Sequence, residues 1–536
     1  SNQSECETLQ NYQEMKKFLL TFSACVPLFA FSQGEVKVTF TNNKTISLPM
    51  EAVDSMLSEP NQQFFHLSYS SDEVENISFS ETVSEKDVDL KASDKPQPFN
   101  QLFSMSAETK EIIVYASFAD GANPIIPLLP KTESFVPSFS TSGSYIFING
   151  KAWKEGDEVK IGKNIEVKVA AYNGDVRTYH FDAVTPSCPI IELKTNGLST
   201  DWSDLKSISV DGKSLDACKI KVKGDSYDSG KKNSFNIKFD SKQEILNITK
   251  NKRWTLEANA GDFACIRGLL GYEIANRVSG SWNPQAKEVV LIMDGYYYGF
   301  YLISEQPRVC KGRVEEGIVM CIEDAPDEGD DYFKSQLFNS LFIMKDPNTG
   351  MDGAKLVRTR EVVEKLEQAI AAKKWSQVHS MLDIQSVAEW TVINEVAKND
   401  KSFGSDTYIY MDDDKKIHFI PSTQSAKAFN ADSDTEGFTA YDRNWVSLLK
   451  DDSDFNSALK NAFEKVKSAE SDILAWIDKK AEQNAGDALA NSYSSSYNSE
   501  TYKNEIANLK DWLSARMWKA MKQQTTPGNL PLKYPS

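Results

Sequence analysis

The hydrophobic pattern shifts along the chain from mainly strand-like to mainly helical, and this shift constrains the fold more than any single motif does. Up to about residue 310, apolar and polar residues alternate in short runs such as "VKVTFTNNKTISL", the pattern of half-buried β-strands. From about residue 355, apolar residues recur every three or four positions, as in "EVVEKLEQAIAAKKW", which predicts amphipathic helices. This order predicts an α+β protein with a β-rich lobe, then a helical lobe, and a cleft between them.

Turn signals and composition divide the 536 residues into five segments. One hairpin is predicted around Asn42-Asn43, and Asn-Gly and Gly-Asp turns further along predict small β-sandwich-like modules. We expect residues 72–100, which are acidic, polar and proline-containing, to form a loop or linker. The predicted segments are a leader (1–32), a β-rich module (33–130), a small β-sandwich-like module (131–186), an α+β domain (187–523) and a C-terminal tail (524–536).

The leader contains a predicted signal peptide at residues 15–32. Its sequence, "MKKFLLTFSACVPLFAFS", has a basic start, an apolar run and a small-x-small cleavage site before Gln33. "FSAC", which ends at Cys25, resembles a lipoprotein box, but the apolar run continues past it. No other stretch approaches the ~20 apolar residues of a membrane span. We therefore expect a protein that is secreted, periplasmic or at the cell surface, without a membrane span.

Charge and cysteine content exclude some classes of site. The formal net charge of -17 argues against nucleic acid as a partner, because nucleic-acid binding needs a dense basic face. Export permits disulfides, and Cys310 and Cys321 flank a predicted hairpin, but buried free thiols are an equally open interpretation. After the leader no cysteine lies in a CxxC motif, and the chain has only four histidines, so we expect no zinc site.

The sequence lacks GxSxG, HExxH, Walker A and GxGxxG motifs, but it carries an ordered series of other segments. A Gly-Asp-Ser turn and paired lysines lead into a strand in "KVKGDSYDSGKKNSFNIKF". A helix begins within "WTLEANAGDFACIRGLLGYEIANRV", and a hairpin turns at Asp-Gly in "VVLIMDGYYYGFYLISEQ". Asn399 and Asp400 then lead from a helix end into "TYIYMDDDKKIHFIP". We interpret Asp412–Asp414 there as a solvated hairpin turn rather than a metal site.

This order of segments resembles the CotH family, atypical secreted kinases named for a bacterial spore-coat protein. In that family an RGNS-like turn, a KKxYRIK strand, a W-x-L…D…LRN helix, an NGxYxGxYxLxE hairpin and an N-x-D…YxY…PWDFD segment follow one another. The resemblance covers roughly residues 188–520 and makes the predicted segment 187–523 a CotH-like domain. It implies a much-altered protein-kinase fold that binds ATP with a divalent metal.

The resemblance also implies roles for particular residues. Asp400 matches the acidic residue of N-x-D and would be the catalytic carboxylate. One of the paired lysines would be the cation on the phosphates, whereas Arg267 is also expected to pair with Asp262 within the lobe. Glu305 and Glu323 end predicted strands where a cleft would lie. The cofactor-binding candidates are therefore Lys231, Lys232, Arg267, Glu305 and Glu323.

The chain departs from the family where the metal is held. In place of P-W-D-F-D it has Pro421-Ser422-Thr423-Gln424-Ser425, so that neutral residues stand where the metal-binding aspartates are expected. Mg²⁺ prefers anionic oxygen ligands. The RGNS-like turn has also become Lys223-Gly224-Asp225-Ser226, with an anion where phosphates would approach. We therefore predict no metal ligands at this site, unless Thr423, Asp432 or Asp434 takes over the role.

Three functions follow from these observations. The first is a pseudokinase-like binding or scaffold protein whose partners are exported or surface proteins. The second is an active atypical kinase that transfers phosphate from ATP, with Mg²⁺, to Ser or Thr of exported proteins. The third is a carbohydrate-binding surface protein that uses exposed aromatics of the β modules, such as Trp153, Tyr172 and Tyr179.

Overall fold

The computed structural model describes the chain in two compact units. One unit contains the residues up to 126 together with 132–184, and the other contains 127–131 together with the residues from 185 onwards. The predicted segments 33–130 and 131–186 thus fall largely within the first unit. The residues that the structure describes are 35–40, 45–49, 74–80, 91–92, 100–118, 123–171, 175–224, 227, 232–327, 329–347, 351–404, 407–421, 428–430, 433–491 and 499–524.

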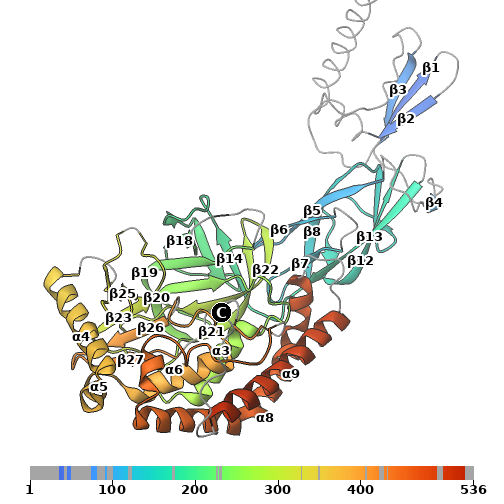
Figure 1. Ribbon diagram of the computed structural model, residues 1–536. Coiled ribbons are helices and arrows are strands. Elements are labelled where there is room, and N and C mark those ends of the chain that lie inside the picture. The colour runs from blue at the N-terminus through green and yellow to red at the C-terminus, as the bar shows by residue number, and fades with distance from the viewer. Residues whose placement is uncertain are drawn as a thin grey trace, which may run out of the picture. The chain divides into compact units, whose positions relative to one another are not determined.

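The first unit begins with a small antiparallel sheet of order β2-β1-β3 (Figure 1). Strands β1 (Glu35–Phe40) and β2 (Thr45–Pro49) pair with Glu35 opposite Pro49, which confirms the predicted hairpin. The prediction of a linker over residues 72–100 was wrong for β3 (Val74–Ser80), which pairs with β1. The acidic residues around this strand obscured the alternation of Ile77 and Phe79 with serine.

The remaining strands of the first unit form two layers that share a core. Phe181 lies in this core, with ring centroids 6.2 Å from Phe118 and 6.1 Å from Phe135 in edge-to-face contacts. One layer has the order β10-β9-β12-β13-β4, with β7 beside β13, and the other β11-β8-β5-β6. The strands are β4 (Lys91–Ala92), β5 (Leu102–Glu108), β6 (Ile113–Ser117), β7 (Ile125–Pro127), β8 (Ser134–Thr141), β9 (Tyr145–Ile148), β10 (Lys151–Ala152), β11 (Val159–Lys160), β12 (Gly162–Ala170) and β13 (Asp175–Val184).

Two of the three aromatic residues proposed to bind carbohydrate are buried. Trp153 packs edge-on against Phe139, with centroids 5.0 Å apart, and is 3% exposed. Tyr179 is also buried, and its hydroxyl accepts a hydrogen bond from the backbone N–H of Leu102 at 3.0 Å. The prediction that Trp153 and Tyr179 are surface aromatics was therefore wrong, and Tyr172 lies outside the described residues. An alternating pattern does not reveal which face of a strand is buried.

The second unit opens with a curved sheet of order β15-β18-β19-β20-β22-β21-β14-β16-β17. Apolar side chains from one face of these strands, including Ile220, Ile237, Trp254 and Leu291, pack into one buried core. Helix α3 (Arg267–Val278) follows β20 and buries Leu270 and Ile274. The strands are β14 (Ile190–Lys194), β15 (Ser203–Asp204), β16 (Ser207–Val210), β17 (Lys213–Ser214), β18 (Cys218–Val222), β19 (Phe235–Ile245), β20 (Ile248–Glu257), β21 (Ala286–Met293) and β22 (Tyr296–Glu305).

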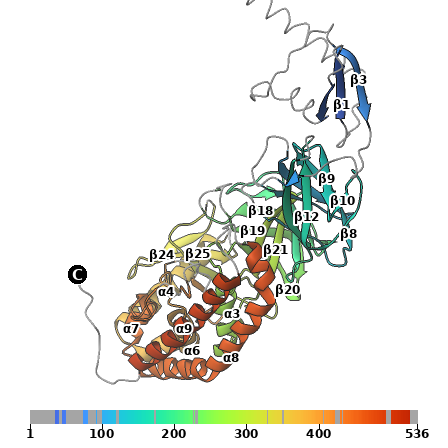
Figure 2. The same ribbon diagram turned by 90° about the vertical axis from the view of Figure 1, so that its right-hand side faces the viewer.

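A second sheet and a set of helices complete this unit. The sheet has the order β24-β25-β23-β26-β27, and the acidic turn at residues 412–414 joins its last two strands as predicted. Figure 2 shows α8 and α9 running side by side, and both pack against α6. The elements are β23 (Ile318–Ile322), β24 (Tyr332–Lys334), β25 (Leu341–Asp346), α4 (Gly353–Ala371), α5 (Trp375–Met381), α6 (Ile384–Val396), β26 (Thr407–Met411), β27 (Ile417–Phe419), α7 (Asn444–Leu449), α8 (Ser453–Asn491) and α9 (Ser499–Gln524).

The predicted α+β class is confirmed, and so is the helical stripe of the last helix. Its residues are all buried: Tyr502, Ile506, Leu509, Leu513 and Met517.

Cys310 and Cys321 are free thiols, as are the other described cysteines, so the disulfide alternative does not hold for these residues. Within the described part of the chain, no helix combines the length and the apolar character that crossing a membrane requires.

Candidate functional site

The candidate site is built on the C-terminal end of α6. This helix is buried on all sides, since every residue from Ser386 to Val396 is buried. Asp383 caps its N-terminus by accepting a hydrogen bond from the backbone N–H of Gln385 at 3.1 Å. At the other end, Asn394 and Glu395 are buried polar residues that must find partners inside the protein.

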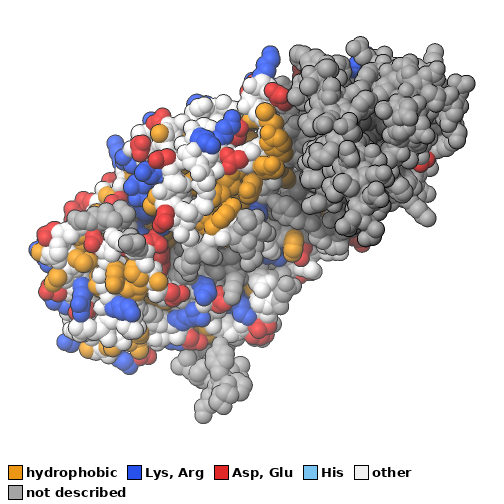
Figure 3. Space-filling view, turned by 90° about the horizontal axis from the view of Figure 1, so that it is seen from above, with side chains coloured by type: hydrophobic (Ala, Val, Ile, Leu, Met, Phe, Trp, Pro, Cys, Tyr) orange, Lys and Arg blue, Asp and Glu red, His pale blue; other side chains and the backbone are white. Residues whose placement is uncertain are grey.

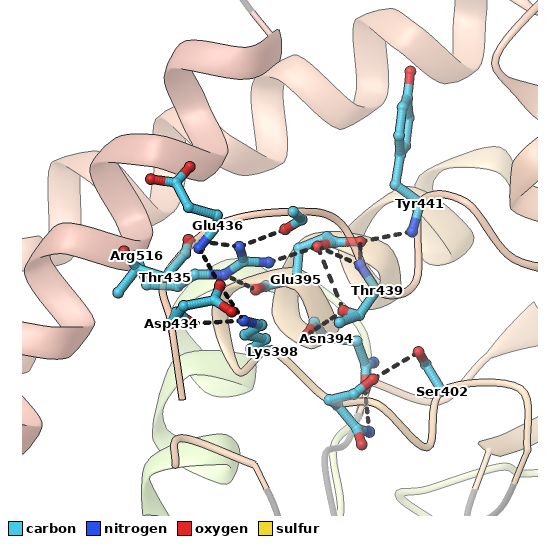
Figure 4. Close-up of polar contacts among 12 residues, drawn as sticks. Asn394, Glu395, Lys398, Ser402, Asp434, Thr435, Glu436, Thr439, Tyr441 and Arg516 are labelled. Carbon is cyan, nitrogen blue, oxygen red and sulfur yellow. Dashed lines mark hydrogen bonds and ion pairs between the residues drawn. The ribbon is translucent and has the colours of Figure 1, made fainter. Parts of the chain in front are cut away.

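Glu395 finds its main partner in Arg516 of α9 (Figure 4). Nη2 of Arg516 lies 2.8 Å from Oε2 of Glu395, and each side chain is only 1% exposed. Arg516 Nε also donates to the carbonyl oxygen of Glu395 at 2.8 Å. Burial raises the pKa of Glu395, and the guanidinium together with backbone N–H donors offsets part of that shift. The pair therefore locks α6 to α9 in the interior.

The same pair also holds the segment 433–441. Nη1 of Arg516 donates to the carbonyl oxygens of Thr435 at 3.0 Å and Gly437 at 2.6 Å. The Glu395 carboxylate accepts from the backbone N–H groups of Thr439 at 2.9 Å and Tyr441 at 2.6 Å. Figure 4 shows this segment drawn around the end of α6 by these contacts. One buried ion pair thus fixes two helices and the loop that follows the expected metal segment.

Asp400 lies in the loop that leaves α6 at this end. Its neighbour Asn399 is buried, and Asn399 Nδ2 donates to Oδ1 of Asn394 at 2.8 Å, so that this amide points into the protein. Ser402 Oγ donates to the carbonyl oxygen of Asn399 at 2.8 Å and closes the turn. Asp400 itself is exposed, and its carboxylate accepts no hydrogen bond from any other described residue. Its predicted catalytic role stays a prediction, but the carboxylate is accessible.

The neutral segment after Pro421 lies outside the described residues, which resume at Ala428. Phe429 is fully buried, and its N–H donates to the carbonyl oxygen of Ala397 at 2.8 Å, so the chain returns to the end of α6. Asp434, one of the predicted substitute metal ligands, is held by Lys398, whose Nζ lies 2.7 Å from its Oδ1. That hydrogen bond lowers the pKa of Asp434 and engages the carboxylate. Asp432 lies outside the described residues.

Arg267 joins three separate parts of the second unit. Nη1 lies 2.9 Å from Oδ1 of Asp262, and Nη2 lies 3.0 Å from Oε2 of Glu505 in α9. Nε donates to the carbonyl oxygen of Phe429 at 3.0 Å. The predicted pairing of Arg267 with Asp262 is confirmed. Because two carboxylates pair with this guanidinium, its positive charge is already compensated inside the protein and attracts a phosphate group less.

Lys232 is held against β22. Its ammonium group donates to the carbonyl oxygen of Phe300 and lies 4.4 Å from the ring centroid of Tyr301, a cation–π contact. Burial lowers its pKa to about 8, and the nearby Cys265 and Asp262 oppose this shift. Lys231, the alternative phosphate cation, lies outside the described residues.

The two predicted cleft carboxylates are both paired with cations. Glu305 is 1% exposed and forms a buried ion pair with Arg313, while its Oε1 accepts from the N–H of Gln285 at 3.0 Å. Glu323 lies 3.3 Å from Nζ of Lys345 on β25. Arg267 and the 428–430 segment therefore lie close to the end of α6. Glu305 forms a separate ion pair with Arg313.

The sequence analysis missed Glu395 and Arg516. The signal for Glu395 was present, because a charged residue in the apolar stretch "IQSVAEWTVINEV" requires a buried partner. Nothing in the sequence identified that partner, which lies 121 residues further along the chain.

Among the described residues, His379, Asp452 and Asp454 have a spacing that a metal ion would fit. The Asp452 carboxylate, however, already has partners within the protein. It accepts a hydrogen bond from the N–H of Asp454 at 3.1 Å as a helix cap, and its Oδ2 lies 2.7 Å from His379 Nε2.

A histidine clamp fixes the other end of α6 to the β26–β27 hairpin. Nδ1 of His418 lies 2.9 Å from Oδ2 of Asp383, and Nε2 lies 3.0 Å from Oδ2 of Asp412. The ring also stacks on Tyr410, with centroids 4.6 Å apart. Burial alone would lower the pKa of His418, but the two carboxylates outweigh this effect and raise it. The hairpin that leads to Pro421 is thereby joined to the N-terminus of α6.

Comparison with models of protein families gives a match. A protein-family model described as CotH kinase protein matches residues 220–519, more than half of the chain. The match contains the Asp400 loop, the Glu395–Arg516 pair and all the cofactor-binding candidates. No curated protein matches the sequence.

Removing one partner of the buried pair should strongly destabilise the protein. Arg516→Met leaves the Glu395 carboxylate buried without its cation, so we expect the free energy of unfolding to fall by about 3–5 kcal/mol. The matched control is Arg277→Met, because Arg277 forms an i,i+4 pair with Glu273 at 2.7 Å and is partly exposed. The Arg277–Glu273 pair contributes less than about 1 kcal/mol to the free energy of unfolding. Urea unfolding measures both losses, and similar values would contradict the proposed role of Arg516.

The histidine clamp predicts a pH dependence. Since the pKa of His418 is raised in the folded protein, its contribution to stability is fully present below the ordinary histidine pKa of about 6.5. That contribution is lost as the pH rises through the raised pKa. The difference in Tm between the wild type and His418→Gln should therefore shrink as the pH increases from about 6 to about 9. A difference that is constant over this range would show that the protonated ring does not clamp the hairpin.

Proposed function

Because the chain belongs to the CotH kinase family, we propose that it is an exported, pseudokinase-like binding or scaffold protein in which the family's metal site is degenerate. The observation that carries this proposal is the neutral segment Ser422–Ser425, in the place of the metal-binding aspartates. Mg²⁺ is a hard cation that is usually held by carboxylates and phosphate oxygens. Hydroxyl and amide side chains supply no negative charge, so the residues present do not fit the ion.

The state of the neighbouring charges supports the same proposal. Phosphoryl transfer needs cations on the phosphates and carboxylates on the metal. Arg267 is neutralised by two carboxylates, and Lys232 is bonded to a backbone carbonyl inside the protein. Asp434 is already bound to Lys398. A nucleotide would have to break these internal contacts before it gained its own, which lowers its affinity.

Export and partners are part of the proposal. The support for export is the leader at residues 15–32, with its basic start, apolar run and cleavage site. A protein of this kind meets other exported or surface proteins, which are the partners that we propose for it.

An active kinase is the second candidate function, and one observation favours it. The Asp400 carboxylate is exposed and accepts no hydrogen bond from other described residues, so it is free to orient a substrate hydroxyl. On this alternative, Asp400→Ala abolishes phosphoryl transfer and leaves the Tm unchanged. Asp413→Ala, in the acidic turn between β26 and β27, is the matched control.

Nucleotide binding separates the two functions. For the wild-type chain, we expect isothermal titration with ATP to give no metal-dependent heat, in Mg²⁺ or in EDTA. A micromolar Kd corresponds to a standard free energy of binding of about -8 kcal/mol. Binding of this strength in Mg²⁺ that disappears in EDTA would overturn the degenerate-site proposal.

Restoring the missing carboxylates provides a positive test. We expect Thr423→Asp combined with Ser425→Asp to introduce Mg²⁺-dependent ATP binding, because the match to the family model extends on both sides of this position. The matched control adds the same two charges on the exposed surface of α8, as Ser468→Asp with Ser471→Asp. Titration of both double variants should give metal-dependent heat for the first only. No gain in the first variant would show that more than the metal ligands has been lost.

A further inference from the structure

Three cations lie directly opposite one another on adjacent strands of the second unit. Lys219 of β18 is opposite Lys238 of β19, and Lys238 is opposite Arg253 of β20. We call these three residues the basic row. Like charges in directly opposite positions destabilise a sheet, so this arrangement needs a reason. Figure 3 shows one face of the molecule, on which Lys and Arg side chains are interspersed with Asp and Glu side chains.

The carboxylates near the basic row only partly compensate it. Lys219 Nζ lies 3.6 Å from Oδ1 of Asp204, whose side chain is 74% exposed. Among the described residues, neither Lys238 nor Arg253 has a carboxylate within ion-pair distance. The positive charges of Arg253, Lys219 and Lys252 lower the pKa of Lys238, with burial as a further cause, whereas Asp240 opposes the shift. The local field at the centre of the row is therefore positive.

Two further groups extend this surface. The indole ring of Trp202 lies beneath two cations, with Arg253 Cζ 5.3 Å and Lys221 Nζ 5.5 Å from its centroid. The guanidinium of Arg308 donates only to the carbonyl oxygen of Pro307 and to Oε1 of Gln306 among the described residues. Burial and the charge of Arg308 lower the pKa of Arg253 to about 10, although Asp346 and Asp330 act in the opposite direction. An aromatic surface is thus combined with two guanidinium groups that have no carboxylate within ion-pair distance among the described residues.

We propose that the basic row binds a carboxylate-rich segment of a partner polypeptide, with acidic residues at alternate positions. Adjacent strands are about 4.8 Å apart, so the row spans about 10 Å. An extended peptide repeats its side chains on one face every ~7 Å, which places two carboxylates within that span. The guanidinium of Arg253 can bind one of them through two hydrogen bonds. The like charges that strain the free sheet are neutralised in such a complex.

A nucleotide and a nucleic acid fit this surface less well. The turn that resembles the family's phosphate-binding turn begins at Lys223, four residues from Lys219, or about 13 Å along the strand. A nucleic acid needs a larger basic face than the three cations of this row provide. The side chains of Lys219 and Lys223 point to the same face of the sheet, because they are four residues apart. The two proposals are therefore tested separately, one with the acidic peptide and one with ATP.

A fluorescent peptide of alternating Glu and Ser tests the proposal on the full chain, with a Gln-Ser peptide as the matched ligand. Fluorescence anisotropy should show that the Glu peptide binds at least about tenfold more tightly than the Gln peptide, and that raising the salt concentration weakens it. Lys238→Gln should weaken binding about tenfold, whereas Lys479→Gln, the same change at an exposed position of α8, should not. Lys238→Gln should also not lower the Tm, because it relieves repulsion in the free sheet.

Three results would overturn the proposal. The first is no preference of the wild-type chain for the Glu peptide. The second is an equal effect of Lys238→Gln and Lys479→Gln on binding. The third is that the wild-type chain binds ATP but not the peptide, and that Lys238→Gln abolishes this ATP binding. That result would make the basic row part of a nucleotide site. A Tm measurement on each variant separates loss of binding from loss of folding.

Discussion

The candidate site depends on the buried ion pair between Glu395 and Arg516. Moving two charges into the interior costs several kcal/mol, and a single contact between them does not repay it. Here the remaining donors and acceptors are also satisfied, by backbone groups of the segment 433–441 and of α6 itself. The pair therefore holds α6, α9 and this segment as one piece. The position of the Asp400 loop follows from that arrangement, because the loop begins where α6 ends.

The distribution of positive charge links the two proposals. In the candidate site the cations are paired internally, as Arg267 with Asp262 and Glu505 illustrates. On β18–β20, by contrast, three cations lie directly opposite one another, and among the described residues only Lys219 has a carboxylate within ion-pair distance. An anionic partner gains most where the protein's own carboxylates have not already neutralised the charge. This contrast is consistent with a family member that binds a partner through its unpaired cations.

The sequence predicted those parts of the fold that local patterns determine. The change of hydrophobic period placed the strands before the helices, and the stripe through Leu509 and Leu513 identified the buried face of α9. Contacts between distant segments could not be predicted, because no local pattern links Glu395 with Arg516 or Arg267 with Glu505. The burial of Trp153 was missed for a related reason, since alternation gives two faces but not the layer that covers one of them.

Metal binding tests the central claim most directly. Mn²⁺ takes the oxygen ligands that suit Mg²⁺ and is paramagnetic, so the signal of the free ion reports how much remains unbound. We would titrate Mn²⁺ with ATP into the wild-type chain and measure the free-ion signal by electron paramagnetic resonance. The account predicts the same signal as in a solution of Mn²⁺ and ATP without protein. A further loss of signal equivalent to one ion per chain would contradict it and would show that the neutral segment after Pro421 does not prevent metal binding.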